Sequence, residues 1–334
     1  MQILFPYALL SLMLSASVAL AEPVKIIFDT DMGNDVDDAL ALAMLHSLQT
    51  RNEVELLAVT LTKDHAEVAP YVDAINTFYG RGEIPIAKTD SGITPGQSRF
   101  TGVGLERDGG EYVYPHDLNI GDQVPLAVAL LRETLANQED KSVVIVQVGF
   151  STNLAQLLQT EADDYSELNG FDLVERKVKN ISIMAGAFEP INGETHLEYN
   201  VVQDIPSAQY LAEYWPTPIY WSGFEIGLAI RYPAISIEED FGYLERHPIS
   251  ESYQAYIPTP HERPTWDLTS VLWTAREDRN YFGVSEPGIV TVLEDGETIF
   301  ESNLAGSHFY LTIPESEIGA VQELLAALVS EPPN

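Results

Sequence analysis

The chain has 334 residues, and its 51 acidic against 17 basic side chains give a formal net charge of −34 at pH 7. This acidic excess is spread along the chain, so binding of nucleic acid or anionic lipid through a basic face is not expected. The sequence contains no cysteine, which excludes disulfide bonds and a thiol nucleophile.

Residues 1–21 have the pattern of a secretory signal. The stretch 3–20 is apolar and uncharged, and it ends in Ala19-Leu20-Ala21, the small-x-small pattern that a signal peptidase accepts. A single membrane anchor is the alternative, but the run is short for a membrane span and Pro6 interrupts it. We therefore expect export to the periplasm or the extracellular space, no membrane association after cleavage, and one domain over residues 22–334.

Short apolar runs then alternate with helical stretches. Strands are predicted at residues 24–28, 56–61, 84–87, 143–148, 181–185 and 219–222, and helices at residues 36–48, 68–79, 125–137 and 152–158. This alternation predicts an α/β domain with a mostly parallel, Rossmann-like central sheet covered by helices on both faces. In such sheets the ligand site lies beyond the carboxyl ends of the strands, so residues that follow strands are the candidates for function.

The C-terminal third is less regular. Residues 232–265 are rich in proline and aromatic side chains, and we interpret them as a lid or an insertion. Residues 289–313 predict a late β-hairpin around Glu294-Asp295-Gly296, and residues 315–329 predict a closing amphipathic helix.

Five aspartates lie within ten residues after the first predicted strand: Asp29, Asp31, Asp35, Asp37 and Asp38. The first two are two residues apart in an extended segment and share a face. The last two begin the next helix, where the helix dipole stabilises negative charge. Acids at a helix start are also common caps, but five carboxylates together are costly unless a cation neutralises them. An all-oxygen site without His or Cys indicates Ca²⁺ or Mg²⁺ rather than zinc.

Two other metal-dependent classes share parts of this pattern. An EF-hand loop counted from Asp29 needs Gly at its sixth position and Glu at its twelfth, but Asn34 and Leu40 stand there. A phosphatase of the haloacid dehalogenase type also begins with a strand and D-x-D, and it would need a lysine and a further acidic pair downstream.

The stretch 24–43, VKIIFDTDMGNDVDDALALA, resembles the N-terminal signature D-x-D-x-G-x-D-D-A of the inosine–uridine nucleoside hydrolase family. Here the second half is two residues longer, so Asp37-Asp38-Ala39 matches D-D-A and Asp35 is extra. Three further segments resemble the family in order: residues 147–154 (QVGFSTNL), 192–200 (NGETHLEYN) and 266–272 (WDLTSVL). The resemblance implies the nucleoside hydrolase fold, dimers or tetramers, and calcium-dependent hydrolysis of ribonucleosides to base and ribose.

The resemblance also implies a set of metal ligands. Asp31, Asp38 and Asp267 would bind Ca²⁺ through their side chains, and Val148 through its carbonyl oxygen. Asp31 would in addition take the proton from the attacking water. These roles suit the chemistry, because calcium can hold two vicinal hydroxyls and a water close to the anomeric carbon, where positive charge develops.

Further polar residues are expected to bind the ribose. By the same resemblance, Asp37, Asn192, Glu198 and Asn200 would bond its hydroxyl groups, and Asp64 after the second strand would lie near the sugar. Each has an ordinary alternative. Asn192-Gly193 is a turn pattern, Glu198 could be a solvated strand residue, and Asp64 could belong to a plain loop.

Trp266 is the largest departure from the family pattern. Many members have a histidine there, thought to protonate the leaving base, whereas purine-preferring members have a tryptophan that stacks on it. An indole is no proton donor near neutral pH, but it can cover a purine face. Trp266 therefore favours purine ribonucleosides, unless it only packs beside a metal ligand.

Three readings of function other than a nucleosidase stay open. The chain could be a calcium-dependent nucleoside- or ribose-binding protein without turnover, a hydrolase of a related non-nucleoside N-riboside, or a structural or toxin-like secreted protein. Retention of Asp31, the expected general base, favours an enzyme.

Overall fold

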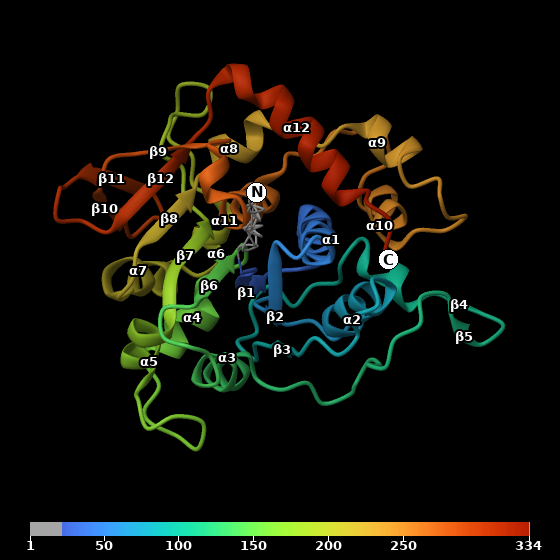
Figure 1. Ribbon diagram of the computed structural model, residues 1–334, viewed down its shortest axis with the longest axis horizontal. Coiled ribbons are helices and arrows are strands. Elements are labelled where there is room, and N and C mark those ends of the chain that lie inside the picture. The colour runs from blue at the N-terminus through green and yellow to red at the C-terminus, as the bar shows by residue number, and fades with distance from the viewer. Residues whose placement is uncertain (1–21, 334) are drawn as a thin grey trace, which may run out of the picture.

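Residues 22–333 are described by a computed structural model, so the predicted signal segment 1–21 lies outside the described residues. Within 22–333, no helix combines the length and the apolar character that a membrane crossing requires. The described residues form a layered α/β fold around a central sheet (Figure 1).

The central sheet has ten strands in the described residues, in the order β11-β10-β12-β8-β7-β6-β1-β2-β3, with β9 paired to β12. The strands from β12 to β3 in that order run parallel: β1 (Val24–Thr30), β2 (Val54–Leu61), β3 (Ile86–Lys88), β6 (Val143–Gln147), β7 (Val178–Met184), β8 (Ile219–Ser222) and β12 (His308–Thr312). Every residue of β6 is buried, as expected for a parallel strand covered on both faces.

Short antiparallel strands complete the β structure. At one edge lie β9 (Gly283–Val284), β10 (Gly288–Val292) and β11 (Thr298–Ser302). A separate ribbon pairs β4 (Arg107–Asp108) with β5 (Glu111–Tyr112).

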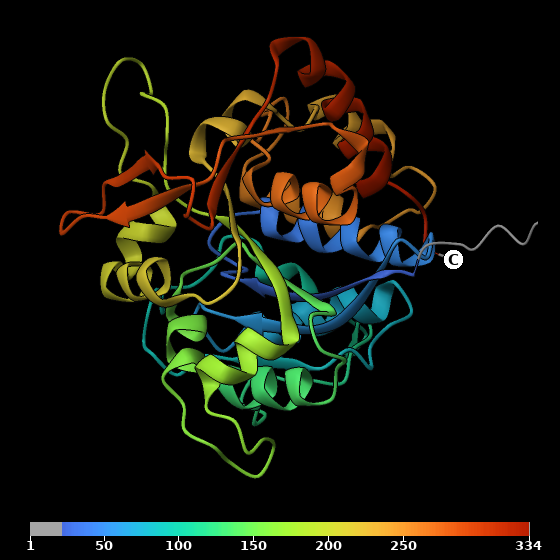
Figure 2. The ribbon, with the colours of Figure 1, turned by 60° about the vertical axis from the view of Figure 1, so that its left-hand side comes forward.

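Helices cover both faces of the sheet, and each layer has its own buried core (Figure 2). One layer contains α1 (Asp37–Thr50), α2 (Val68–Phe78), α10 (Pro248–Tyr256), α11 (Trp266–Ala275) and α12 (Glu315–Val329). The opposite layer contains α3 (Ala127–Ala136), α4 (Thr152–Leu158), α5 (Gly170–Lys177) and α7 (Ile205–Tyr214). Short helices lie in the connections: α6 (Tyr199–Gln203), α8 (Phe224–Ala229), α9 (Ala234–Glu239), and the 3₁₀ turns η1 (Thr101–Leu105) and η2 (Glu277–Arg279).

The predicted fold class is confirmed: an α/β domain with a mostly parallel sheet and helices on both faces. The closing helix is confirmed as α12, and the late hairpin as β10–β11. The range predicted as a hairpin, residues 289–313, also contains a third strand that was not predicted, β12. This strand pairs in parallel with β8 in the central sheet. The segment 232–265 contains α9 and α10 and continues into the start of α11.

The order of the strands places a crevice between β1 and β6. From β1 the chain moves outward to β2 and β3, returns through α3 to β6, and then moves the other way to β7 and β8. Asp29 near the end of β1 is in register with Gln147 at the end of β6. At such a reversal of strand order, the carboxyl ends of the two strands leave room for a ligand.

Candidate active site

A cavity of about 600 Å³ lies at the carboxyl ends of these strands. Its polar floor is formed by acidic and amide side chains that follow β1 and β7 and by Asp267 of α11, and its outer walls by aromatic and apolar side chains. The lining residues are Asp31, Asn34, Asp35, Asp37, Asp38, Val148, Met184, His196, Leu197, Glu198, Tyr199, Asn200, Val202, Phe224, Tyr256, Arg263, Trp266 and Asp267.

Three buried carboxylates meet where two helices begin. Asp37 and Asp38 start α1, Asp267 is the second residue of α11, and one oxygen from each lies within 4.8 Å of the others. The backbone N–H of Asp267 donates to Asp37 Oδ2 at 3.2 Å. Thr30 Oγ1 donates to Asp38 Oδ1, whereas Asp38 Oδ2 has no hydrogen-bond partner within residues 22–333.

Burial raises the pKa of all three of these carboxyl groups well above the ordinary value, and neighbouring aspartates raise it further. The arrangement is therefore costly while the groups are ionised and without a cation.

A hard cation fits this group of residues. The donors are all oxygen atoms, and the oxygens of a calcium shell lie 2.3–2.6 Å from the ion, so opposite ligands are about 5 Å apart. The unpartnered Asp38 Oδ2 gives a free ligand atom. The residues that would hold the ion are Asp37, Asp38 and Asp267, with Asp31 and the Val148 carbonyl on the same cavity wall.

Asp31 lies in the turn after β1 and is tied to a lysine through an amide. Asn34 Nδ2 donates to Asp31 Oδ2 at 2.9 Å, and Lys63 Nζ donates to Asn34 Oδ1 at 2.8 Å and to the Thr94 carbonyl at 2.6 Å. Burial raises the pKa of Asp31 to about 7, more than the Asn34 hydrogen bond lowers it. A carboxylate with a pKa near neutrality is suited to accept a proton from water.

The turn after β6 approaches β1 closely. The backbone N–H groups of Val148 and Gly149 both donate to the Asp29 carbonyl, at 2.7 and 3.1 Å. A Cβ atom at Gly149 would lie 2.6 Å from the backbone nitrogen of Asp31, so only glycine fits there. This packing places Val148 in the cavity lining, together with Asp31.

Glu198 and Asn200 enter from the start of α6. Glu198 is buried and caps the helix: it accepts from the backbone N–H groups of Gly186, Asn200 and Val201, at 3.2, 2.8 and 3.1 Å. Burial nevertheless raises the pKa of Glu198 to about 7. Asn200 Nδ2 donates to the carbonyl of Val148 at 2.8 Å. Glu198 is thus a cap and a cavity residue at once, not a solvated strand residue.

The aromatic wall is built around Trp266. Its ring stacks on Phe224 with centroids 5.1 Å apart, and its indole N–H donates to the Phe224 carbonyl at 2.9 Å. The ring of His196 also contacts Phe224, with 3.8 Å between the ring centroids. The indole N–H is therefore already used, and Trp266 presents a face or an edge, but no donor, to the cavity.

An ion pair closes one side of the cavity. Arg263, in the segment between α10 and α11, donates from Nε to Asp35 Oδ1 at 2.9 Å and from Nη2 to Asp35 Oδ2. Its guanidinium carbon lies 5.0 Å from the Trp266 ring centroid and 5.2 Å from that of Tyr256.

The structure brings most of the predicted site residues together. Those that line the one cavity are Asp31, Asp37, Asp38, Val148, Glu198, Asn200, Trp266 and Asp267. The compact carboxylate trio contains Asp37, which was expected to bond a ribose hydroxyl, and does not contain Asp31, which was expected to be a ligand.

Two expected sugar-binding residues lie outside this cavity lining. Asp64 forms an ion pair with Lys88, the last residue of β3, at 2.7 Å and accepts a hydrogen bond from the backbone N–H of Gly92. Both oxygens of its carboxylate therefore already have partners. Asn192 is exposed at a left-handed turn position, with φ of 53°, and Gly193 follows it with φ of 82°. For both residues the ordinary alternative, a loop or a turn, describes the structure.

Several cavity residues were not predicted from the sequence. Phe224 lies two residues after the end of β8, so the rule for strand ends could have identified it. Tyr256 and Arg263 come from the irregular segment 232–265, which was interpreted only as a lid or an insertion. No local pattern connects Arg263 with Asp35, because 228 positions separate them.

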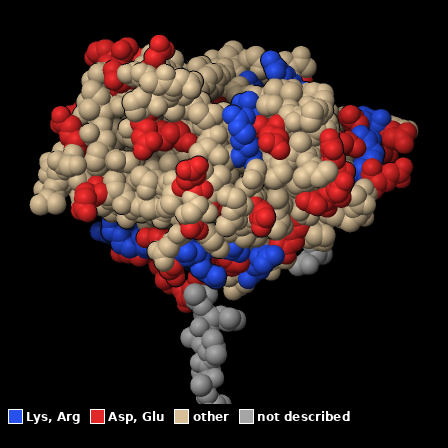
Figure 3. Space-filling view, turned by 90° about the horizontal axis from the view of Figure 1, so that it is seen from above, with Lys and Arg blue, Asp and Glu red and all other residues tan. Residues whose placement is uncertain are grey.

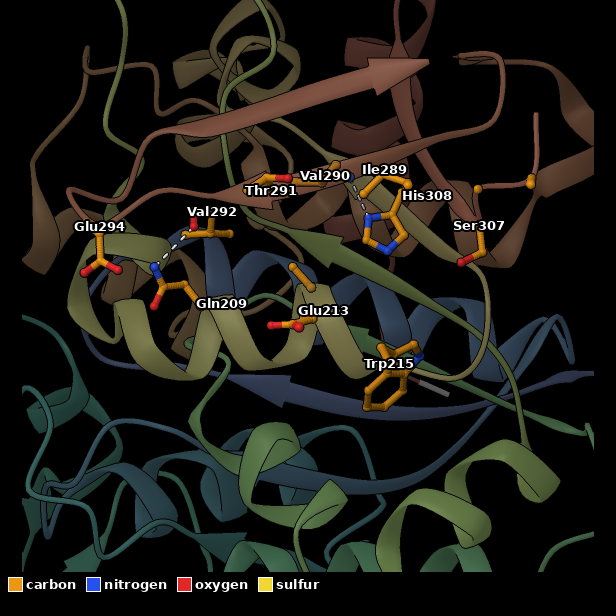
Figure 4. A pocket seen from close by; sticks show the side chains of 13 residues that line it. Gln209, Glu213, Trp215, Ile289, Val290, Thr291, Val292, Glu294, Ser307 and His308 are labelled. Atoms are coloured by element: carbon orange, nitrogen blue, oxygen red, sulfur yellow. Dashed lines mark hydrogen bonds between the residues drawn. The ribbon is translucent and has the colours of Figure 1, made fainter. Parts of the chain in front are cut away.

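A second cavity of about 610 Å³ lies between α7 and β10 (Figure 4). Its polar groups are largely engaged within the fold. His308 Nδ1 accepts from the Val290 N–H at 2.9 Å, and Gln209 donates to the Val292 carbonyl at 3.2 Å. It lies away from the carboxyl ends of β1 and β6 and contains no group of converging acids in the described chain, so the first cavity is the candidate site.

The distribution of charged side chains can be followed on one face of the molecule in Figure 3. On the face drawn in Figure 3, acidic side chains are widespread and basic ones lie in small groups beside them. Among the described residues on that face, no continuous basic patch is visible.

Comparisons with known proteins point to one family. The family model described as inosine-uridine preferring nucleoside hydrolase matches residues 26–302. The protein of that description from Crithidia fasciculata is 26% identical over 220 residues, which cover 64% of this chain and 63% of the relative, less than two thirds of its length.

Solved structures agree on the fold. A plant nucleoside hydrolase is 20% identical, with a TM-score of 0.67 over 93% of this chain and 100% of the other. The purine-preferring ribonucleoside hydrolase from Gardnerella vaginalis is 18% identical, with a TM-score of 0.67 over 92% and 99% of the two chains.

Proposed function

Because the chain belongs to the inosine-uridine preferring nucleoside hydrolase family, we propose that it hydrolyses the N-glycosidic bond of ribonucleosides, with purine ribonucleosides preferred and with Ca²⁺ as cofactor. One observation carries this proposal. A single cavity holds a buried carboxylate with a raised pKa, a carboxylate trio with all-oxygen donors, and an aromatic wall large enough for a base.

The proposed division of labour follows the positions of the groups. Asp37, Asp38 and Asp267, with the Val148 carbonyl, would hold Ca²⁺; when bound, calcium supplies attachment for hydroxyl oxygens and lowers the pKa of a ligated water. Asp31 accepts the proton of the attacking water. The water oxygen bonds to the anomeric carbon while the carbon–nitrogen bond breaks. The electron pair of the broken carbon–nitrogen bond leaves with the base.

The other side chains orient the substrate. Asn200 is held by the Val148 and Met184 carbonyls, which fixes its amide toward the cavity. Glu198 fixes the backbone of Asn200 and lines the same wall. The exposed sides of Tyr199 and Leu197 and the ring of Trp266 enclose the space in which a base would lie, and they exclude part of its water.

A panel of ribonucleosides tests this proposal. Purified protein with calcium is incubated with inosine, adenosine, guanosine, uridine and cytidine, and released reducing sugar is measured beside an Asp31→Asn sample. Release by the wild type and not by the variant supports the proposal. Nucleoside binding in calorimetry without any release would assign the alternative function, a binding protein without turnover.

Export and assembly into dimers or tetramers stay predictions from the sequence. Residues 1–21 lie outside the described chain, and light scattering of the purified protein measures the assembly state.

A further inference from the structure

The extra aspartate of the N-terminal motif, Asp35, has a partner far along the chain. Its carboxylate takes the Nε–H and one Nη2–H of Arg263, and both side chains are largely buried, with 23% and 19% of their surface exposed. Arg263 is the one residue with a guanidinium or ammonium group among the described residues that line this cavity. A fixed positive charge is thus placed on the wall of the proposed substrate site.

The backbone of Arg263 is held as firmly as its side chain. Its N–H donates to the Tyr253 hydroxyl at 2.8 Å, and its carbonyl accepts from the Tyr232 N–H at 2.7 Å. The guanidinium also lies within cation–π distance of Trp266 and Tyr256. Such a group is pre-organised, so little conformational entropy is lost when it contacts a ligand.

Part of the guanidinium remains available to a substrate. A guanidinium has five N–H groups, and Asp35 takes two of them, so three remain. Within residues 22–333, no acceptor is found for these three. The three are both N–H groups of Nη1 and one N–H group of Nη2. These two nitrogens together can donate two parallel hydrogen bonds to two adjacent acceptors.

From this geometry, and resting on the proposed function, we propose that Arg263 contacts the leaving base and selects 6-oxopurine ribosides such as inosine and guanosine. A 6-oxopurine presents O6 and N7 as adjacent acceptors, which is the pattern that arginine recognises with two hydrogen bonds. Adenine presents a donor, its 6-amino group, beside N7 and would face a group that only donates. Pyrimidines lack N7.

The same contact assists bond cleavage. As the bond between the anomeric carbon and N9 breaks, its electron pair spreads over the ring to N7 and O6, and a fixed cation stabilises that charge. Burial lowers the pKa of Arg263, but the hydrogen bond and the charge of Asp35 with its neighbours raise it above the ordinary value, so Arg263 stays protonated throughout. The base takes its proton from solvent. Trp266 cannot replace this contact because its N–H is donated to Phe224.

Asp35 acts in this scheme as a positioning residue. It touches the substrate only through the guanidinium that it orients, and it neutralises part of the charge that Arg263 brings into the wall. We expect Asp35→Asn to reproduce a weaker form of the Arg263 defect, with the same pattern over substrates.

The test compares substrates whose leaving groups differ. Values of kcat/KM are measured for inosine, adenosine and 4-nitrophenyl riboside with the wild type, Arg263→Gln, Arg263→Lys and Asp35→Asn. The matched control is Arg231→Gln, an exposed arginine that donates to the Glu262 carbonyl outside the cavity lining. The 4-nitrophenolate ion is stable without a proton or a cation, so this substrate reports the sugar and metal part of the site alone.

We expect Arg263→Gln to lower kcat/KM for inosine about 10- to 100-fold, the range that corresponds to a lost bidentate contact to a base. Adenosine should lose less, and 4-nitrophenyl riboside should stay within about 3-fold. Arg263→Lys keeps the charge but not the fork, so it should fall between the wild type and Arg263→Gln.

Equal losses on inosine and on 4-nitrophenyl riboside would show that Arg263 only supports the structure, and an unchanged ratio of inosine to adenosine would overturn the assigned selectivity. Failure of the proposed function gives a different result, since the wild type would then release ribose from none of the three substrates.

Discussion

The side-chain amide of Asn200 donates a hydrogen bond of 2.8 Å to the carbonyl oxygen of Val148. The two residues belong to segments that follow β7 and β6, and they meet in the floor of the cavity. One amide therefore links the carbonyl that is predicted to bind calcium with the wall that is predicted to bind ribose.

Asn200→Ala should weaken both functions of this link. Removal of the amide takes away the hydrogen bond that positions the Val148 carbonyl, and it also takes away a polar contact to the sugar. We therefore expect KM for inosine to rise about 10-fold or more, in line with the loss of one or two hydrogen bonds. Calcium affinity, measured by titration calorimetry, should also fall. Asn137→Ala, at an exposed helix end, is the control and should change neither value.

Asp31→Asn should separate catalysis from metal binding. An asparagine keeps an oxygen that can accept from Asn34 Nδ2, but it cannot take a proton from water. We expect kcat to fall about 10²- to 10⁴-fold, while calcium still raises the melting temperature. Asp38→Asn should instead remove most of that calcium-dependent increase. Near wild-type kcat in Asp31→Asn would rule out its role as the base.

Stability should depend on pH and calcium together. In the folded chain, burial raises the pKa of Asp31 to about 7 and those of Asp37, Asp38 and Asp267 well above the ordinary value of 3.8. Between about pH 4 and pH 7 the folded state then binds more protons than the unfolded state, so these groups contribute stability at low pH and lose it as pH rises.

The melting temperature of protein treated with EGTA should therefore fall as pH rises through this window. Added calcium should restore it, and the gain should be larger at about pH 8 than at about pH 5, because calcium replaces protons as the partner of the carboxylates. Differential scanning calorimetry at both pH values checks this. An equal gain at both, or no gain, would mean that the carboxylates do not bind the ion.

Trp266 should influence the choice of base. The wild type is expected to favour inosine over uridine, since a purine offers the larger face and stacking is worth about 1–3 kcal/mol per base. Trp266→Ala removes the ring that contacts both Phe224 and Arg263, so the ratio of kcat/KM for inosine to that for uridine should shrink about 10-fold. Trp266→Phe keeps a ring and should retain most of the ratio. A uridine preference in the wild type would contradict this role.

The layers of the fold could be predicted because buried parallel strands are continuous apolar runs. The run 143–148 was predicted as a strand, and β6 occupies five of its six positions, all buried. The rule for strand ends then identified Asp31 after β1 and Val148 after β6. Asp64 also follows a strand, but its carboxylate pairs with the Lys88 side chain at the end of the next strand, and it lies outside the cavity lining.

Other positions depend on local turn geometry or on long-range contacts. Asn192-Gly193 is a strong turn pattern, and both residues have the left-handed φ values of a turn outside the cavity lining. Tyr256 is the last residue of α10, and Arg263 lies in the connection between α10 and α11, in a part of the sequence to which no helix or strand was assigned. Their place on the cavity wall depends on contacts with Asp35 and Trp266, which only the tertiary structure brings near.

The central claim is that this cavity hydrolyses N-ribosides and requires calcium to do so. The most direct measurement is the amount of hypoxanthine and ribose formed from inosine by one protein sample, first treated with EGTA and then supplied with excess Ca²⁺. We predict no product in EGTA, and equal amounts of base and ribose after calcium is restored. Intact inosine in the presence of calcium, or the same rate in EGTA, would contradict the account.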